Sequence, residues 1–181
     1  MNKINFGFIS TLEGGATCTG YVPDPKNSKS GVTIATGFDI GQRSNDDLRF
    51  MLPLNIAAKL CRYCGVKGEA ALKLLNVNPV NITTTEAEII DLCVKNIMVE
   101  RLTQRYNEVS KVPFEMLPEQ AKTVIASVAF QYGNLAKRCP KFWRFATTGN
   151  WLAMVEELKS FGDRYTTRRL KEAEYFIRES E

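Results

Sequence analysis

The chain contains no histidine among its 181 residues. Imidazole is the base in Ser-His and Cys-His hydrolases and a common ligand of catalytic metals. Its absence excludes hydrolases of the usual triad design and histidine-ligated metalloenzymes. Any acid–base chemistry must therefore come from carboxyl groups.

Long hydrophobic runs are missing as well. No apolar stretch of the sequence approaches the roughly 20 residues that cross a bilayer. The N-terminus also lacks the basic start and long apolar centre of a secretory signal peptide. We therefore expect no membrane insertion. Action outside the cytoplasm would need export without a classical signal, or membership of a larger secreted protein.

Cysteine is present, but not in a metal-binding arrangement. Of the five cysteines, Cys61 and Cys64 form one CxxC pair, and no second pair or histidine completes a four-ligand zinc shell. Residues 54–65 are typical of a helix that ends at Gly65. We therefore expect cysteines on a helix face, with no metal and no cofactor.

The charge of the chain is modest, with a formal net charge of +4 and a pI near 8.8. Its basic residues are dispersed, and no nucleic-acid-binding motif accompanies them, so anionic polymers such as bacterial cell walls are better candidate partners than nucleic acid. Hydrophobic content of 44% and charged content of 24% are ordinary for a globular protein. The length suits one domain, or two lobes that share a helix.

A first candidate carboxylate stands at the end of a short helix. Ile4, Phe8 and Leu12 recur every four residues and predict one helical face, with Glu13 at its C-terminal end before two glycines. The negative end of the helix dipole favours the protonated form of a carboxyl group, which suits a general acid. The alternative is a solvent-exposed glutamate beside a glycine stop.

A second candidate lies in the segment 20–41. Its proline, asparagine and serine residues predict a loop, and the alternating Val32, Ile34 and Phe38 then predict a strand or hairpin. A period of two places Thr33 and Asp39 together on the opposite face, with small residues between them. The two would flank an open floor that suits a sugar ring. A half-solvated strand with a turn aspartate is the alternative.

The remainder of the sequence reads as helical. Thr83 and Glu86 form a capping box before a broad apolar stripe, which predicts a long and largely buried helix over 85–109. Three later helices are predicted to begin at Pro118, Asn150 and Thr167.

The residues quoted above resemble a known family. Glu13-Gly14-Gly15, the Gly-Tyr-Val-Pro-Asp segment at 20–24 and the run from Gly31 to Asp39 together resemble the phage-type lysozymes. They are most similar to the pesticin-like branch of bacterial toxin and effector domains. Further segments extend the likeness over essentially the whole chain, at Val128–Gly133, Phe142–Trp151, Arg164-Tyr165 and Arg168-Arg169.

The resemblance implies a single lysozyme-like domain of the α+β class. It would comprise a small lobe at 1–82 with the active-site helix and a β-hairpin, a connecting helix at 83–109, and a helical lobe at 110–181. The implied activity is that of a muramidase, which hydrolyses the bond between N-acetylmuramic acid and N-acetylglucosamine in peptidoglycan.

Site residues carry over from the resemblance as follows. Glu13 is the acid, and Thr33 matches the threonine that helps to hold the attacking water. The second carboxylate is Asp24 by the phage pattern and Asp39 by the pesticin-like pattern. We favour Asp39, because it shares its predicted strand face with Thr33. Candidates for lining the sugar cleft are Tyr21, Gln131 and Arg169, for each of which a structural role is the alternative.

In such a pair the acid is protonated while its partner stays ionised. A threonine that positions water favours an inverting reaction, which predicts carboxyl groups roughly 6.5–9.5 Å apart.

The resemblance further implies an antibacterial toxin or effector, or an endolysin, that acts on the cell wall in the periplasm of a target cell. An immunity protein that plugs the cleft is the expected partner. The alternative functions are a lysozyme fold that binds glycan or an inhibitor without cutting, and hydrolysis of chitin-like polymers.

Overall fold

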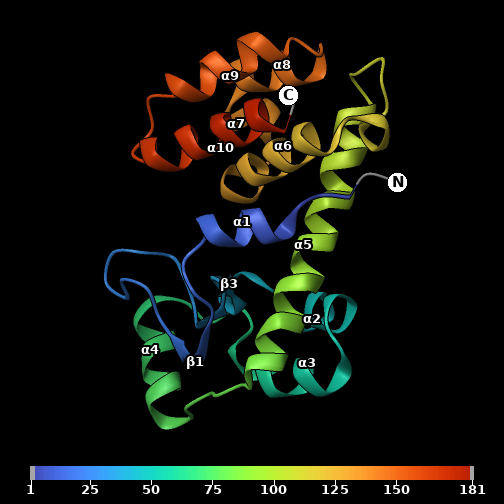
Figure 1. Ribbon diagram of the computed structural model, residues 1–181. Coiled ribbons are helices and arrows are strands. Elements are labelled where there is room, and N and C mark those ends of the chain that lie inside the picture. Colours follow the sequence, from blue (N-terminus) through green and yellow to red (C-terminus); the bar gives the residue numbers. More distant parts are fainter. Residues whose placement is uncertain (1–2, 180–181) are drawn as a thin grey trace. The chain divides into compact units, whose positions relative to one another are not determined.

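The computed structural model describes residues 3–179. They form two compact units, which we call the sheet unit, residues 13–97, and the helical unit, residues up to 12 together with those from 98 onward. The long helix α5, Thr84–Asn107, has residues in both units (Figure 1). A small antiparallel sheet among many helices confirms the predicted α+β class. The three-part division at 82 and 109 within one domain stays a prediction.

The three strands of the described residues all lie in the sheet unit. Besides the first part of α5, its elements are β1 (Thr17–Tyr21), β2 (Thr33–Ala35), β3 (Phe38–Asp39), the 3-10 turn η1 (Ile40–Gln42), α2 (Asn45–Met51), α3 (Leu54–Leu60), η2 (Cys61–Tyr63) and α4 (Gly68–Val77). The helical unit contains α1 (Phe6–Leu12), η3 (Phe114–Met116), α6 (Glu119–Tyr132), α7 (Leu135–Arg138), α8 (Pro140–Thr147), α9 (Trp151–Lys159) and α10 (Thr166–Arg178).

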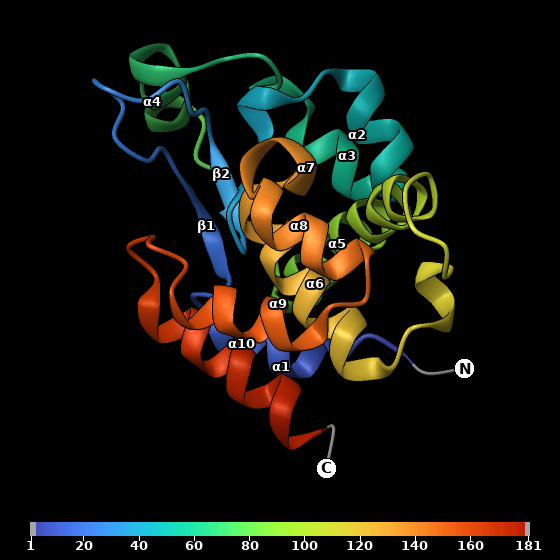
Figure 2. The same cartoon turned by 90° about the horizontal axis from the view of Figure 1, so that it is seen from above.

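The predicted strand from 32 to 39 is a hairpin. The chain reverses at Thr36 and Gly37, and Gly37 takes a φ of +79°, a conformation that glycine adopts without steric cost. The strand order is β1-β2-β3, with β1 and β2 side by side (Figure 2). In this register Tyr21 lies opposite Thr33, and Thr33 lies opposite Asp39.

The core of the sheet unit forms around β2. Ile34 packs with side chains from η1, α2 and α3, and Ile90 of α5 joins the same cluster. Because β2 is the central strand and is buried on both faces, Thr33 and Ala35 are as inaccessible as their apolar neighbours. Burying this cluster supplies the main stabilisation of the unit.

The helical unit is built around α6. Residues 121–129 of this helix are all buried, and α10 packs against both α6 and α9. The helix begins at Glu119, one residue later than predicted, with Pro118 as its N-cap residue. The predicted cap of α9 is confirmed, because the Asn150 side chain accepts a hydrogen bond from the Ala153 N–H at 3.2 Å.

Two helix predictions need correction. Thr167 is not an N-cap residue, since α10 already begins at Thr166. The Asp163 carboxylate accepts the Tyr165 N–H at 2.8 Å and fixes the chain just before this helix. The long helix α5 is also less buried than predicted. Its Ile90 and Leu102 are in the cores, but Leu92 is 54% exposed, because the core of the sheet unit covers only one side of this helix.

All five cysteines are free thiols. The helix predicted over 54–65 is shorter than expected, since α3 ends at Leu60; Cys61 opens the 3-10 turn η2, and Cys64 follows that turn outside any helix. No helix within residues 3–179 has both the length and the apolar character needed to cross a membrane.

Candidate active site

Three of the residues singled out in the sequence form one row across the sheet. Tyr21, Thr33 and Asp39 are successive partners on β1, β2 and β3. Directly paired residues of antiparallel strands place their side chains on the same face. Tyr21 is 43% exposed and Thr33 only 3%, while Asp39 is half-buried. The row therefore leads from an exposed aromatic ring, past a buried hydroxyl, to a partly accessible carboxylate.

Gly31 joins the last two members of this row. Its N–H donates to Oδ1 of Asp39 at 3.0 Å, and its carbonyl accepts a hydrogen bond from the Thr33 hydroxyl at 3.2 Å. The second carboxylate oxygen of Asp39 has no hydrogen-bond partner among residues 3–179. One oxygen thus orients the carboxylate, and the other is available to a ligand.

Only glycine fits at position 31. A Cβ atom there would lie 2.4 Å from the Val66 carbonyl oxygen and 2.5 Å from the Gly41 Cα atom, both of which are backbone atoms that cannot turn aside. The close approach of Gly31 and Gly41 therefore sets the position of the N–H that binds Asp39.

Glu13 follows directly after α1 and forms an ion pair with α5. Its Oε2 lies 3.3 Å from Nζ of Lys95, and the two side chains are 16% and 14% exposed, respectively. The alternative of a solvent-exposed glutamate is therefore not observed. A nearby ammonium group of this kind holds the carboxyl group in a defined position.

A second residue of α5 anchors the hairpin. Asp91 accepts hydrogen bonds from the Thr36 N–H at 3.1 Å and from the Thr36 hydroxyl at 2.6 Å. Asp91 and Lys95 are four residues apart and therefore share one face of the helix. That face contacts both the Glu13 segment and the turn between β2 and β3. Sequence reasoning missed these contacts, because spacing on a helix does not identify tertiary partners.

Asp24, the other candidate for the second carboxylate, has a local role. It is exposed and has a φ of +42°. Its Oδ1 accepts hydrogen bonds from the backbone N–H of Asn27 at 3.3 Å and from the Asn27 side chain at 3.0 Å. An aspartate that bonds to the backbone a few residues on is typical of a turn.

Gln131 and Arg169 lie together in the helical unit. Arg169 is 1% exposed and binds Asp163 at 3.0 Å, as well as Glu172 and the Gln131 side-chain oxygen. Burial alone would lower the pKa of Arg169, but the Glu172 and Asp163 carboxylates raise it, and the net shift is upward. The guanidinium is thus fully used by protein partners.

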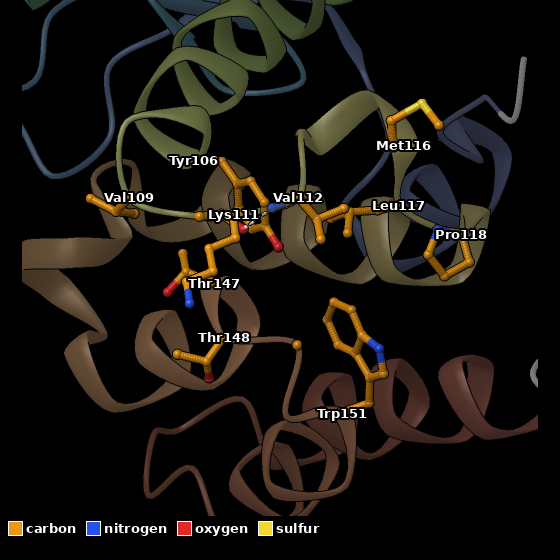
Figure 3. Close-up of a pocket in the computed structure, with 12 residues that line it drawn as sticks. Tyr106, Val109, Lys111, Val112, Met116, Leu117, Pro118, Thr147, Thr148 and Trp151 are labelled. Atoms are coloured by element: carbon orange, nitrogen blue, oxygen red, sulfur yellow. Dashed lines mark hydrogen bonds between the residues drawn. The ribbon is translucent and has the colours of Figure 1, made fainter.

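The helical unit also has a cavity of about 530 Å³. Trp151 projects into it from α9, opposite Val112 and Leu117 (Figure 3). Among residues 3–179, Lys111 is the one charged residue that lines it and no carboxyl group does, so the described lining supplies no acid and no base. Within residues 3–179 there is also no cluster of three or more potential metal ligands.

Comparison with known protein families identifies the family to which the chain belongs. A family model described as "Pesticin: Bacterial toxin homologue of phage lysozyme, C-term" matches residues 3–152. A comparison with curated proteins gave no match. The matched segment spans most of the sequence and includes Glu13, Thr33 and Asp39. The chain therefore belongs to the pesticin family of bacterial toxin domains that are homologous to phage lysozyme.

Proposed function

We propose that the protein is a muramidase that cleaves the bond between N-acetylmuramic acid and N-acetylglucosamine in peptidoglycan. Membership of the family supports a lysozyme-type toxin. The observation that carries the specific proposal is the row of Tyr21, Thr33 and Asp39, which brings a hydroxyl and a carboxylate to one face of the sheet. Cell walls of target cells are the expected place of action.

In the proposed reaction Glu13 donates its proton to the leaving glycosidic oxygen. Asp39 accepts a proton from a water molecule that Thr33 helps to place, and that water attacks the anomeric carbon from the opposite side. The result is inversion, which requires carboxyl groups roughly 6.5–9.5 Å apart. The surroundings of the two carboxyl groups must differ, because Glu13 has to hold a proton while Asp39 stays ionised.

The ion pair with Lys95 bears on the acid role of Glu13. An ionised Glu13 cannot donate a proton, and protonation removes the charge that Lys95 pairs with. We propose that Lys95 holds the ionised Glu13 between turnovers. Glu13 then takes up a proton from solvent as the substrate displaces Lys95, and it donates this proton to the glycosidic oxygen that has become its partner.

The proposal assigns the second carboxylate to Asp39 rather than Asp24. Asp39 stands in the row with Thr33 and keeps one oxygen available, whereas the carboxylate of Asp24 is used within its own turn. Tyr21 is proposed as a surface on which a sugar ring stacks, because its exposed ring is amphipathic. The burial of Arg169 and its bond to Gln131 favour support of the helical unit over direct substrate contact.

Replacing Glu13 by glutamine tests the proposal. Glutamine keeps the shape of the side chain but cannot donate the proton, so clearance of a purified cell-wall suspension should slow by about 10²-fold or more. Glu69→Gln is the matched control, because Glu69 is an exposed residue of α4. Sedimentation with cell walls shows whether binding is retained.

The same experiment decides between the enzyme and the alternative of a binding module. If wild-type protein sediments with cell walls but never clears them, the protein binds glycan without cleaving it. If Glu13→Gln clears them as fast as wild type, the assignment of the acid is wrong.

An immunity protein that covers the site is the partner we propose. Immobilising the protein and passing a lysate of the producing strain over it would capture this partner.

A further inference from the structure

The segment that follows α3 carries two cysteines on one tight turn. Cys61 opens the 3-10 turn η2 and Cys64 follows it, so both stand at the turn rather than on a helix face. The Cys64 N–H donates to the Cys61 carbonyl at 3.2 Å and closes the turn. Both side chains are free thiols, and the proposed reaction uses neither.

The geometry of η2 brings the two cysteines to the same side. In a 3-10 turn, residues three apart eclipse each other, and a rise of about 2.0 Å per residue places their Cα atoms roughly 6 Å apart. Disulfides join cysteines whose Cα atoms are about 4.4–6.8 Å apart. The Cys61 thiol donates to the Ala58 carbonyl at 3.3 Å, and because Cys61 is exposed, its side chain can leave this bond without disturbing the core. A disulfide between Cys61 and Cys64 therefore needs the rotation of an exposed side chain and no change of fold.

The turn is fixed by its contacts with the rest of the sheet unit. Tyr63, between the two cysteines, is 2% exposed, and its hydroxyl donates to the Asn78 carbonyl at 2.7 Å. Arg62 donates to the Asn78 side chain at 3.1 Å. The Val66 N–H donates to the Tyr63 carbonyl at 3.3 Å. Because these contacts hold the backbone in its turn, the two thiols have a higher effective concentration than in a flexible chain.

The two thiols differ in their surroundings. Cys61 is exposed, whereas Cys64 is half-buried and packs against the core of the sheet unit. Burial, together with the nearby Cys61 and Asp47, raises the pKa of the Cys64 thiol. The thiolate is the attacking species in thiol–disulfide exchange, and access also controls its rate. Cys61 is therefore the thiol that an incoming disulfide meets first.

We propose that Cys61 and Cys64 form a redox-active pair, which a small-molecule disulfide of the glutathione type oxidises to an intramolecular disulfide. The Cys61 thiolate attacks one sulfur of the incoming disulfide, releases one thiol and leaves a mixed disulfide on Cys61. The Cys64 thiolate then attacks Sγ of Cys61 and releases the second thiol. The two cysteines lose two electrons and two protons, and the incoming disulfide takes them up. Because disulfides persist in oxidising compartments such as the bacterial periplasm, the pair is reduced in the cytoplasm and oxidised outside it.

Peptide mapping tests the oxidation. The reduced protein is incubated with excess oxidised glutathione, remaining thiols are blocked by alkylation, and trypsin digestion follows without reductant. Trypsin cleaves after Lys59, Arg62 and Lys67, so a disulfide within the pair joins peptides 60–62 and 63–67 and is identified by their combined mass. We expect this linked product. Separately alkylated peptides, a stable glutathione adduct in wild type, or a link to one of the other three cysteines would overturn the proposal.

Single variants test the order of the two steps. Cys64→Ser lacks the second thiol and should keep one glutathione on Cys61. Cys61→Ser should react with oxidised glutathione at least about tenfold more slowly than Cys64→Ser, because its remaining thiol is half-buried. Cys18→Ser is the matched control, since Cys18 is also half-buried but lies outside the turn, and it should give the linked peptides as wild type does. Equal rates for Cys61→Ser and Cys64→Ser would contradict the assigned order.

A synthetic peptide of residues 60–67 shows whether the fold builds this site. The peptide carries the same two cysteines without the contacts that Tyr63 and Arg62 make with Asn78. The equilibrium constant for exchange with glutathione should be at least about tenfold larger in the folded protein than in the peptide. A tenfold ratio corresponds to about 1.4 kcal/mol of added stability, so oxidation should also raise the melting temperature of the protein. Equal constants would overturn the inference. None of these measurements uses cell walls, so their outcome is independent of the proposed muramidase activity.

Discussion

Thr33 and Asp39 lie directly opposite each other on β2 and β3, and both side chains hydrogen-bond to Gly31. A single residue thus ties the candidate water-holding hydroxyl to the candidate base. Positioning of this kind accounts for much of what an enzyme site contributes to rate, because the reacting groups need no rearrangement. The alignment depends on the sheet register and on the close approach of two glycines.

Gly31→Ala should damage both the fold and the site. The added methyl group would meet backbone atoms 2.4–2.5 Å away, so the strand must shift and the N–H that holds Asp39 moves with it. We expect a loss of stability of about 1–3 kcal/mol and a fall in cell-wall clearance. Gly15→Ala is the control, because no atom lies within 4 Å of a Cβ there. Equal melting temperatures for the two variants would contradict the account of Gly31.

Asp91→Asn tests the anchor between α5 and the hairpin. Asparagine has no charge and only one accepting oxygen, so both bonds to Thr36 lose their charge assistance and the one to the hydroxyl must reverse its direction or break. Hydrogen bonds to charged groups contribute about 1.5–3 kcal/mol, so the melting temperature should fall by several degrees. Asp46→Asn is the control, because the Asp46 side chain is 95% exposed, and it should leave the melting temperature unchanged. Matching melting curves for both variants would show that the anchor contributes nothing.

Asp39→Asn and Asp24→Asn discriminate between the two candidates for the second carboxylate. Loss of the base at Asp39 should reduce kcat by about 10²-fold or more, whereas loss of a turn contact at Asp24 should change kcat little. Both variants are assayed on the same cell-wall substrate, with circular dichroism as a check on folding. The reverse order of effects would return the role to Asp24.

The helical unit should lose stability in alkaline solution through Tyr132. Burial and the hydrogen bond to Asp163, 2.6 Å long, raise the pKa of Tyr132 to about 12 from its usual value of 10.0. A group whose pKa is higher in the folded state stabilises that state below its unfolded pKa, and the contribution disappears as the pH rises through the folded value. The melting temperature should therefore fall between pH 10 and about 12, by less in Tyr132→Phe than in wild type. Identical slopes would contradict the shift.

The sequence predicted those features that local chemistry determines. The capping box at the start of α5 is confirmed, because Thr83 donates its N–H to Glu86 at 2.9 Å and accepts the Glu86 N–H at 3.1 Å. Both bonds connect residues three apart, so spacing alone is enough to find them. The cap at Asn150 was predictable for the same reason. The turn at Gly37 was not, because the alternation over 32–38 fits a continuous strand as well as a hairpin.

Contacts between distant parts of the sequence were not predictable. Lys95 pairs with a residue 82 positions earlier, Glu13, and no periodicity encodes that partner. The burial of Arg169 was also missed, because an arginine is ordinarily exposed unless several acceptors surround it. The acceptors here are Asp163 from the loop before α10, Glu172 from α10 and Gln131 from α6.

Labelling of the new reducing ends of digested peptidoglycan tests the central claim most directly. Borohydride reduction after digestion, followed by acid hydrolysis and mass spectrometry, identifies the sugar at each new end. The account predicts reduced muramic acid with wild-type protein and at least about 10²-fold less with Glu13→Gln. Reduced glucosamine as the new end, or no new ends from wild-type protein that still binds cell walls, would contradict it.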